Sequence, residues 1–454
     1  MSDAPGPGTV PAPVAGDDTG GANGTALLRF AAVGSVDDGK STLIGRLLHD
    51  TKQLFDDQLE AISTASRRRG VDGVDLSFVT DGLRAEREQG ITIDVAYRYA
   101  ATPNRKFVIA DCPGHVQYTR NMATGASTAD LAVVVVDATA GLREQTRRHC
   151  CIAALLGVRH LVVAANKLDL TGWDEAASRR VGEEMDRLAE RLGVETVLTV
   201  PVSALHGDNV VERSTHTPWY DGPTILQALE DAPAGAWATE GAAGARLPVQ
   251  WVVRHPGGGR SYAGMVSGGT LRAGDEVVVL PGGAKSRILS VGTFDGALDE
   301  AASSLSVTVA LEDDLDVARG DLIAAADGAP EVLREFDATL CWFGERPVSA
   351  GARFRIKHTT RVTPAVLTSL AGRLDVDSLT LQPAAELGHN DIGVGRLTVA
   401  TPVAADPYHE NRVTGSFVVI DEATNATVAA GMVGAPVVLG AGTGSTAGVG
   451  TTAG

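Results

Sequence analysis

The sequence predicts an α/β P-loop domain with a mostly parallel sheet, followed by two antiparallel β-barrel domains. Three observations support this prediction. Apolar strand-like runs alternate with helical stretches from Leu27 to Glu230. A glycine-rich phosphate loop follows the first run and opens a helical stretch. Beyond the Ala/Gly-rich segment Asp231–Ala245, helical periodicity fades, and short strand-like runs recur, many of them about 8–12 residues apart.

The first domain is expected to be a parallel sheet covered on both faces, because its strand-like runs are continuous and rich in valine. Asp94–Ala100 alternates instead, and a turn leads from it into the next run, which predicts an antiparallel hairpin at the sheet edge. The runs expected as parallel strands are Leu27–Val33, Lys106–Ala110, Leu131–Val136, Leu161–Ala165 and Val197–Val200. The main helices are expected at Ser41–Asp50, Glu144–Leu156 and Asp174–Leu192.

These patterns divide the chain into five segments. Residues 1–24 are rich in Gly, Ala and Pro and are expected to be a disordered leader, and residues 438–454 a disordered tail. Residues 25–235 form the P-loop domain. The roughly 200 residues after the linker suffice for two barrels, predicted at 246–330 and 331–437. Strand-like runs such as Pro248–Val253, Glu276–Leu280 and Arg353–Lys357 fall within them.

Composition limits the possible partners and compartments. The 454-residue chain carries a formal net charge of −17, and an acidic surface repels phosphate backbones, so we expect no nucleic-acid partner. None of the four cysteines has C-x-x-C spacing, which fits a reducing compartment and the cytoplasm. The longest apolar stretches, such as Leu131–Val136, are far too short to span a bilayer, so we expect no membrane partner.

The strongest motif is G-x-x-x-x-G-K-S after the first strand-like run. Its glycines let backbone N–H groups close around phosphate oxygens, and the following helix N-terminus adds partial positive charge. Lys40 is expected to reach the β- and γ-phosphates and Ser41 to ligate Mg²⁺. Asp37 fits either a monovalent-cation ligand or a loop-capping residue. The expected contacts are Gly34, Ser35, Val36, Asp37, Asp38, Gly39, Lys40, Ser41 and Thr42.

A second motif indicates guanine rather than adenine. Asn-Lys-Leu-Asp follows the run Leu161–Ala165. A carboxylate there can accept both the N1–H and the exocyclic amine of guanine, and a polar site that requires two such bonds rejects adenine by about 10⁴-fold. The triplet Ser-Ala-Leu after the next run matches the third base-contacting segment of GTPases. The expected base-binding residues are Asn166, Lys167, Asp169, Ser203, Ala204 and Leu205.

A third motif, Asp-Cys-Pro-Gly-His, ends the run Lys106–Ala110. Asp111 is expected to hold Mg²⁺ through water, and the backbone N–H of Gly114 to contact the γ-phosphate, with Cys112 and Pro113 between them. His115 is the candidate catalytic residue that orients the attacking water. Upstream, Thr92 in Gly-Ile-Thr-Ile is the candidate second side-chain ligand of Mg²⁺, so the predicted metal ligands are Ser41, Thr92 and Asp111.

The order of these motifs resembles the elongation-factor class of GTPases. Longer strings resemble the large, GTPase subunit of heterodimeric sulfate adenylyltransferases: VTDGLRAEREQGITIDVAYRY at Val79–Tyr99, QYTRNMATGAS at Gln117–Ser127 and PWYDGPT at Pro218–Thr224. The resemblance covers about residues 27–433. It implies GTP and Mg²⁺ as cofactors.

The resemblance also implies a partner, a small catalytic subunit that transfers the adenylyl group of ATP to sulfate, in a heterodimer or a higher assembly. GTP hydrolysis would drive this first step of sulfate assimilation. Some relatives fuse an adenylylsulfate kinase to the C-terminus, and that activity is expected to be absent here because the chain has no second phosphate loop. The alternative is an elongation-factor-type GTPase that binds aminoacyl-tRNA.

One polar cluster lies outside these motifs. Arg143, Arg147, Arg148 and His149 occupy the helical stretch Glu144–Leu156 or its start. A cluster of this kind is usually a solvated helix face, and we expect it to be exposed here.

Overall fold

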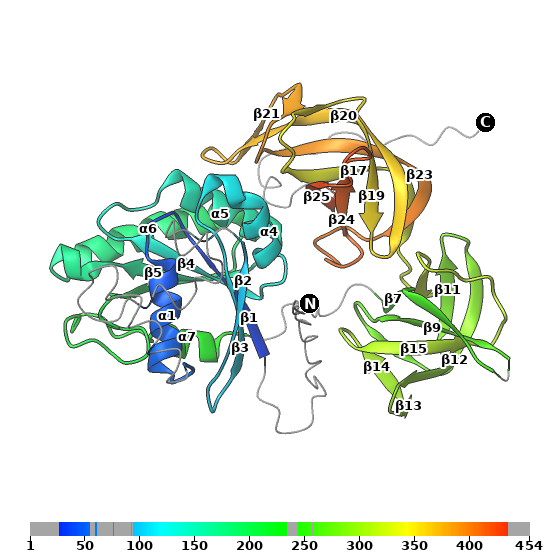
Figure 1. The fold of residues 1–454 in the computed structure, drawn as a ribbon, viewed down its shortest axis with the longest axis horizontal. Helices are drawn as coiled ribbons and strands as arrows, with labels where there is room; N and C mark the ends of the chain where they lie inside the picture. The colour runs from blue at the N-terminus through cyan, green and yellow to red at the C-terminus, as the bar shows by residue number, and fades with distance from the viewer. Residues whose placement is uncertain are drawn as a thin grey trace, which may run out of the picture.

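The computed structural model describes residues 27–54, 60, 76, 92, 94–233, 244–256 and 258–434. Three units are visible in Figure 1: an α/β unit, a first β unit (β7–β16) and a second β unit (β17–β25). The leader, the tail and most of the segment Val79–Tyr99 lie outside the described residues. No helix in the part of the chain that the structure describes is long and apolar enough to cross a membrane.

The α/β unit is built on one six-stranded sheet in the order β2-β3-β1-β4-β5-β6. All neighbouring strands are parallel except β2 and β3, which pair antiparallel. This confirms the predicted parallel sheet and its edge hairpin. The strands are β1 (Leu27–Val33), β2 (Ala96–Ala101), β3 (Lys106–Asp111), β4 (Leu131–Asp137), β5 (His160–Asn166) and β6 (Thr196–Pro201).

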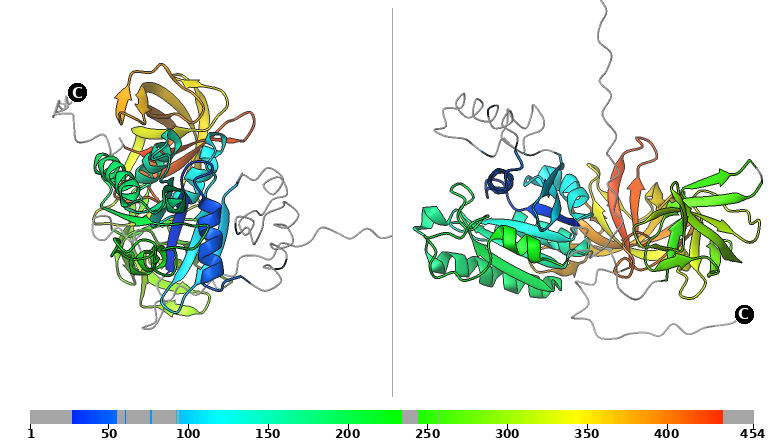
Figure 2. Two further views of the ribbon diagram at one scale, coloured as in Figure 1. Left: turned by 90° about the vertical axis from the view of Figure 1, so that its left-hand side faces the viewer. Right: turned by 90° about the horizontal axis from the view of Figure 1, so that it is seen from below.

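Helices cover both faces of this sheet, as continuous apolar strands require. Leu43 and Leu229 belong to the core on one face, and Met122, Ile152 and Met185 to the core on the other. Figure 2 shows α1 on one side of the sheet and α5 and α6 on the opposite side. The helices are α1 (Lys40–Asp50), α4 (Thr119–Ala126), α5 (Glu144–Leu155), α6 (Glu175–Leu192) and α7 (Ile225–Asp231), with short 3₁₀ turns η2 (Val116–Tyr118) and η3 (Leu168–Thr171).

The first β unit is an antiparallel sheet that curls round on itself. Its main path runs β7-β16-β11-β12-β15-β9-β8, and a bridge between Arg246 and Ser267 joins β7 to the residues just beyond β9. Its strands are β7 (Arg246–Pro248), β8 (Trp251–Arg254), β9 (Arg260–Met265), β10 (Thr270–Arg272), β11 (Glu276–Leu280), β12 (Ala284–Thr293), β13 (Gly296–Leu298), β14 (Glu300–Ala302), β15 (Ser306–Leu311) and β16 (Leu322–Ala325).

One predicted strand is wrong in this unit. Pro248–Val253 reads as one apolar run, but β7 ends at Pro248 and β8 begins at Trp251. The two pieces have different partners, because β7 pairs with β16 whereas β8 pairs with β9. A strand that changes partners must break, and the local sequence does not show the change.

The second β unit is a closed antiparallel barrel. Its pairings run β19-β24-β25-β17-β23-β20, and β20 pairs back with β19, so the ring has no open edge. β17 begins at Glu331, the residue at which the second barrel is predicted to start. The strands are β17 (Glu331–Trp342), β18 (Val348–Ser349), β19 (Arg353–His358), β20 (Arg361–Asp375), β21 (Thr380–Gln382), β22 (Glu386–Leu387), β23 (Ile392–Ala405), β24 (Ser416–Ile420) and β25 (Thr427–Val433).

A buried ion pair joins the two β units. Arg246 and Asp406 are both buried, and the guanidinium donates to the two carboxylate oxygens at 3.1 and 2.9 Å. Thr414 Oγ1 also donates to Asp406, at 2.5 Å. Such a pair is costly to break, because removing one partner leaves the other charge buried without compensation.

We therefore expect Asp406→Ala to destabilise the β units by about 3 kcal/mol, measured by urea denaturation. Asp337→Ala is the matched control. Its carboxylate receives the same two-pronged contact from Arg396, at 2.8 and 2.9 Å, but both side chains are about half exposed. Solvent weakens such a pair, so its loss should cost much less. Equal losses in the two variants would contradict this account.

Candidate functional site

The phosphate loop lies between β1 and α1, at the carboxyl edge of the sheet, and its backbone requires glycine at two positions. Gly34 and Gly39 have φ values of +146° and +97°. A Cβ at Gly34 would lie 2.4 Å from the carbonyl oxygen of Val135, and one at Gly39 would lie 2.3 Å from Nδ2 of Asn166. The loop is therefore packed directly against β4 and against the end of β5, where the Asn-Lys-Leu-Asp motif begins.

The buried Asp38 side chain forms a hydrogen bond within the phosphate loop. Its Oδ2 accepts a hydrogen bond from the Ser35 N–H at 3.0 Å, and its Oδ1 lies 3.5 Å from the Arg143 guanidinium. Burial raises the pKa of Asp38, while the Ser35 N–H and the Arg143 charge oppose that rise. The carboxylate thus shapes the loop, whereas Asp37, with φ of +64°, is exposed on its outside.

Lys40 begins α1 and is buried beneath the loop. Its Nζ donates to the carbonyl oxygens of Gly34 and Ser35, at 3.1 and 2.7 Å. Burial lowers the pKa of Lys40, while the carboxylates of Asp111 and Asp38 favour the charged form. Ser41 and Thr42 follow in the first turn of α1 and are half-buried.

The Asp-Cys-Pro-Gly-His segment meets the phosphate loop at the end of β3. Asp111 is fully buried and pairs in register with Ala32 of β1, two residues before the loop begins. A Cβ on Gly114 would lie 2.4 Å from Nζ of Lys40 and 3.0 Å from backbone atoms of Ser35 and Val36, so this segment approaches the phosphate loop closely. The Cys112 thiol packs in the core near Ala110 and Met122, and burial raises its pKa.

His115 follows Gly114 and is half-buried, with its ring centroid 5.9 Å from that of Tyr118. Its Nδ1 accepts a hydrogen bond from the Gln117 N–H at 3.4 Å. The ring is thus held by the turn that leads into α4.

Thr92 is described, but its neighbours Ile91 and Ile93 are outside the described residues, so its role as a metal ligand stays a prediction.

Asn166 joins three predicted segments. It ends β5 and is buried. Its Nδ2 donates to the Asp38 carbonyl oxygen of the phosphate loop at 2.8 Å, and its Oδ1 accepts from the Ala204 N–H at 2.9 Å. One amide therefore fixes the phosphate loop, the Asn-Lys-Leu-Asp motif and the Ser-Ala-Leu motif against one another.

The remaining residues of the predicted base-binding segments surround Asn166. Lys167, with φ of +63°, donates from Nζ to Asp137 at 2.8 Å. Burial alone would raise the pKa of Asp137, but Lys167 and Thr139 outweigh it and lower that pKa. Asp169 lies in η3, and its Oδ2 is 3.9 Å from Nε2 of His206.

The Ser-Ala-Leu segment is also tied to α1. Arg46 donates to the carbonyl oxygens of Ala204 and Leu205, at 3.3 and 2.5 Å. Ser203 and Ala204 are buried, whereas the Leu205 side chain is exposed. Arg46 was not among the predicted residues. Its position six residues after Lys40, on the helix that the phosphate loop opens, was the available signal.

The exposed-face prediction is wrong for His149 of α5. His149 and its neighbour Thr146 are both fully buried against the phosphate loop. Only Arg143 and Arg147 of the cluster are about two-fifths exposed, and Arg148 is mostly covered by the second β unit, where it donates to the Asn390 carbonyl oxygen at 3.2 Å. The part of this polar face that holds Thr146, Arg148 and His149 is therefore an internal contact surface.

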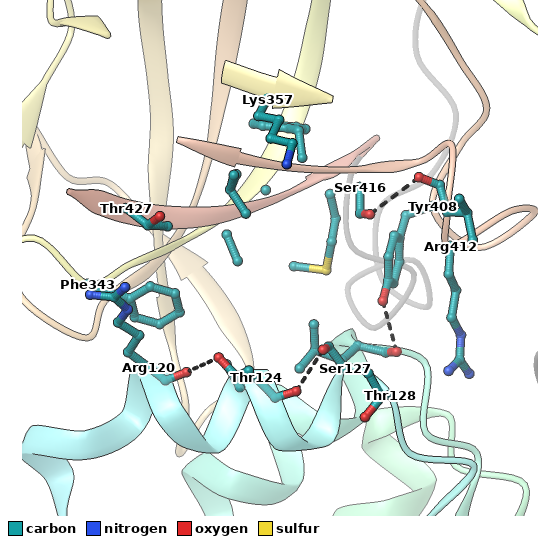
Figure 3. A pocket seen from close by; sticks show the side chains of 18 of the residues that line it. Arg120, Thr124, Ser127, Thr128, Phe343, Lys357, Tyr408, Arg412, Ser416 and Thr427 are labelled. Carbon is teal, nitrogen blue, oxygen red and sulfur yellow. Dashed lines mark hydrogen bonds between the residues drawn. The ribbon is translucent and has the colours of Figure 1, made fainter. Parts of the chain in front are cut away.

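A separate cavity of about 600 Å³ lies between α4 and the second β unit (Figure 3). Thr124, Phe343 and Lys357 are among the residues that line it. At its edge the Tyr408 hydroxyl donates to the carbonyl oxygen of Leu156 at 3.0 Å, which ties the barrel to the end of α5. The described residues that line this cavity include none of the predicted nucleotide contacts.

The arrangement defines a GTPase-type α/β unit followed by β units, and family models support this class. Residues 25–234 match the elongation factor Tu GTP binding domain, and residues 335–434 match the GTP-eEF1A C-terminal domain-like family. Both matches agree with the class that the order of motifs predicts.

Individual relatives narrow the class. The chain is 47% identical to sulfate adenylyltransferase subunit 1 of Alteromonas mediterranea, over 90% of this chain and 86% of the relative. It is 52% identical to the bifunctional enzyme CysN/CysC of Mycobacterium tuberculosis, over 90% of this chain and 67% of the relative. With the bifunctional enzyme NodQ of a Rhizobium strain, the identity is 47% over 90% of this chain and 63% of that protein. The chain belongs to the sulfate adenylyltransferase subunit 1 family.

Proposed function

We propose that this chain binds and hydrolyses GTP as the GTPase subunit of a sulfate adenylyltransferase. The observation that carries the proposal is the Asn166 side chain, which bonds the phosphate loop and the Ser-Ala-Leu segment at once. A nucleotide that contacts the loop with its phosphates would therefore meet the base-binding segments at a fixed distance. In this proposal Asp169 accepts the N1–H and the exocyclic amine of guanine, and Lys167 and Ser203 to Leu205 border the base.

The phosphates would be bound by Gly34 to Thr42, with Lys40 turning from the loop carbonyls to the β- and γ-phosphates. Hydroxyl and carboxylate oxygens are the ligands that Mg²⁺ prefers, so Ser41, Thr92 and Asp111 form a chemically suitable set. Bound Mg²⁺ would neutralise charge on the phosphate oxygens. Because Gly114 has no side chain, its backbone lies close to Lys40 and the phosphate loop, where its N–H would contact the terminal phosphate.

His115 is proposed to orient the attacking water, so His115→Ala should slow hydrolysis roughly 100-fold while GTP affinity changes less than about twofold. Single-turnover hydrolysis and calorimetry measure the two effects. The control is His409→Ala, since His409 is an exposed histidine of the second β unit. Unchanged turnover in His115→Ala would remove His115 from the mechanism.

The partner in this proposal is a separate small subunit in the cytoplasm, which transfers the adenylyl group of ATP to sulfate and releases pyrophosphate. The resulting phosphate–sulfate anhydride is unfavourable to make, and GTP hydrolysis would supply the energy. Release of the γ-phosphate would free the segments around Gly114 and Thr92 together, which gives a route from hydrolysis to a conformational change.

Two measurements test the proposal. The isolated chain should bind GTP and should not bind ATP, and calorimetry measures both. The purified complex with the small subunit should then form adenosine 5′-phosphosulfate from ATP and sulfate faster when GTP is supplied. A complex that makes no phosphosulfate in the presence of GTP would overturn the pathway assignment, whereas a chain that binds ATP as well as GTP would overturn the site itself.

A further inference from the structure

Helix α5 holds the phosphate loop with residues spaced three apart. His149 Nδ1 accepts a hydrogen bond from the Gly34 N–H at 3.3 Å. Thr146 Oγ1 lies 2.8 Å from the Ser35 hydroxyl. Arg143, the residue before the helix, donates to the Val36 carbonyl oxygen at 3.1 Å. Three consecutive loop residues are therefore each bound by one residue along the same helix face.

The contacts made by Thr146 and His149 are shielded from water. Thr146 and His149 have no exposed surface, and Ser35 is 3% exposed. Burial and the nearby Lys40 ammonium lower the pKa of His149 to about 3, so the ring is neutral near pH 7 and Nδ1 keeps the lone pair that the Gly34 N–H needs. The other ring nitrogen lies 2.8 Å from the side-chain amide of Gln145.

Other contacts of α5, and of the residue just after it, bind the helix to the barrel. Arg148 donates to the Asn390 carbonyl oxygen, and Tyr408 donates to the Leu156 carbonyl oxygen just beyond the helix. Cys151 of α5 shares one buried core with Ile392 and Met432 of the barrel. A helix fixed on the barrel can resist movement of the loop that it holds.

We propose that Thr146 and His149 are positioning residues for nucleotide binding. They fix the Gly34 N–H and the Ser35 hydroxyl so that the rest of the loop is already closed around the phosphate positions. This inference rests on the proposed GTP site. Neither residue would touch the nucleotide; each acts through the loop.

The test compares two replacements of His149. His149→Leu fills much of the space but leaves the buried Gly34 N–H without an acceptor, and we expect GTP and GDP affinity to fall roughly tenfold. His149→Asn places an oxygen near the position of Nδ1 and should restore affinity to within about threefold of the unaltered chain. A purely packing role predicts the opposite order, since asparagine is smaller and polar. Calorimetry at matched protein concentrations measures all three proteins.

Two further variants keep the test decisive. Thr146→Val preserves shape, removes the partner of the Ser35 hydroxyl and should weaken binding roughly fivefold even if His149→Leu does not fold. Cys150→Ala is the control, because Cys150 is buried on the same helix in the apolar core, and its loss should lower the melting temperature without weakening binding. Tight GTP binding by the unaltered chain and equally tight binding by His149→Leu or Thr146→Val would overturn this inference alone. No GTP binding by the unaltered chain would overturn the proposed function as well.

Discussion

Lys40→Ala is expected to weaken GTP binding by at least ~100-fold, because the loss of a charged donor to phosphate costs about 3 kcal/mol. The structure adds a reason for a large effect. Lys40 is the buried cation of the loop, and its Nζ lies where Gly34, Ser35 and Gly114 converge. With alanine at this position, the loop has no Lys40 ammonium to bind the phosphates. Titration calorimetry with GTP and GDP measures the loss.

Lys106→Ala is the matched control, since Lys106 is an exposed lysine at the start of β3 and its removal should leave binding unchanged. Lys40→Met retains most of the aliphatic stem and separates the loss of charge from the loss of packing. Both Lys40 variants should retain the circular dichroism spectrum of the unaltered chain. Binding within threefold of normal in folded Lys40→Met would refute the assignment of Lys40.

The fold of the α/β unit could be predicted because its signals are local. The apolar runs Leu131–Val136 and Leu161–Ala165 lie within β4 and β5, and the run Leu27–Val33 has the bounds of β1. A continuously apolar strand requires cover on both faces, so the layered architecture follows from the runs themselves. The first β unit was harder to predict, because the break after Pro248 depends on a change of pairing partner.

The site could be predicted only as far as motifs reach. The phosphate loop and the segments beginning at Asp111 and Asn166 lie close together because each follows a strand of the same parallel sheet, and all these strands end at one edge. The burial of Thr146 and His149 was missed, because a polar helix face looks solvated unless its partner is known. Their spacing after Arg143, on the helix that follows β4, was the signal that could have found them.

The aminoacyl-tRNA alternative shares the fold and the nucleotide motifs, so neither distinguishes it. The distinction comes from the relatives, which carry the sulfate adenylyltransferase name at 47% identity over most of their length. The net charge of −17 points the same way, because an RNA ligand needs compensating positive charge. Fold alone would have left both functions open.

Asp169→Asn is expected to move base preference from guanine towards xanthine. In the proposed site the carboxylate would accept two hydrogen bonds from guanine, whereas an amide presents one acceptor and one donor. The donor would face the exocyclic amine of guanine, which also donates, but it would match the oxygen that xanthine carries at that position. A site built around two such bonds discriminates by about 10⁴-fold, so we expect GTP affinity to fall by several hundredfold or more and xanthosine triphosphate to become the better ligand. Competition binding with GTP, ATP and xanthosine triphosphate measures the change.

The structure allows this change to be separated from a loss of stability. The contact of Asp169 within the protein is to His206 at 3.9 Å, and the His206 side chain is 56% exposed, so the amide should cost the fold little. Asp174→Asn is the matched control, because Asp174 caps α6 by accepting from the Ala176 N–H, and asparagine caps a helix equally well. The control should bind GTP normally and ignore xanthosine triphosphate. Intact GTP affinity in Asp169→Asn would mean that another group recognises the base. Asn166 fixes this segment against the phosphate loop and the Ser-Ala-Leu segment. The other group would therefore have to come from Ser203 to Leu205 or from outside the three motifs.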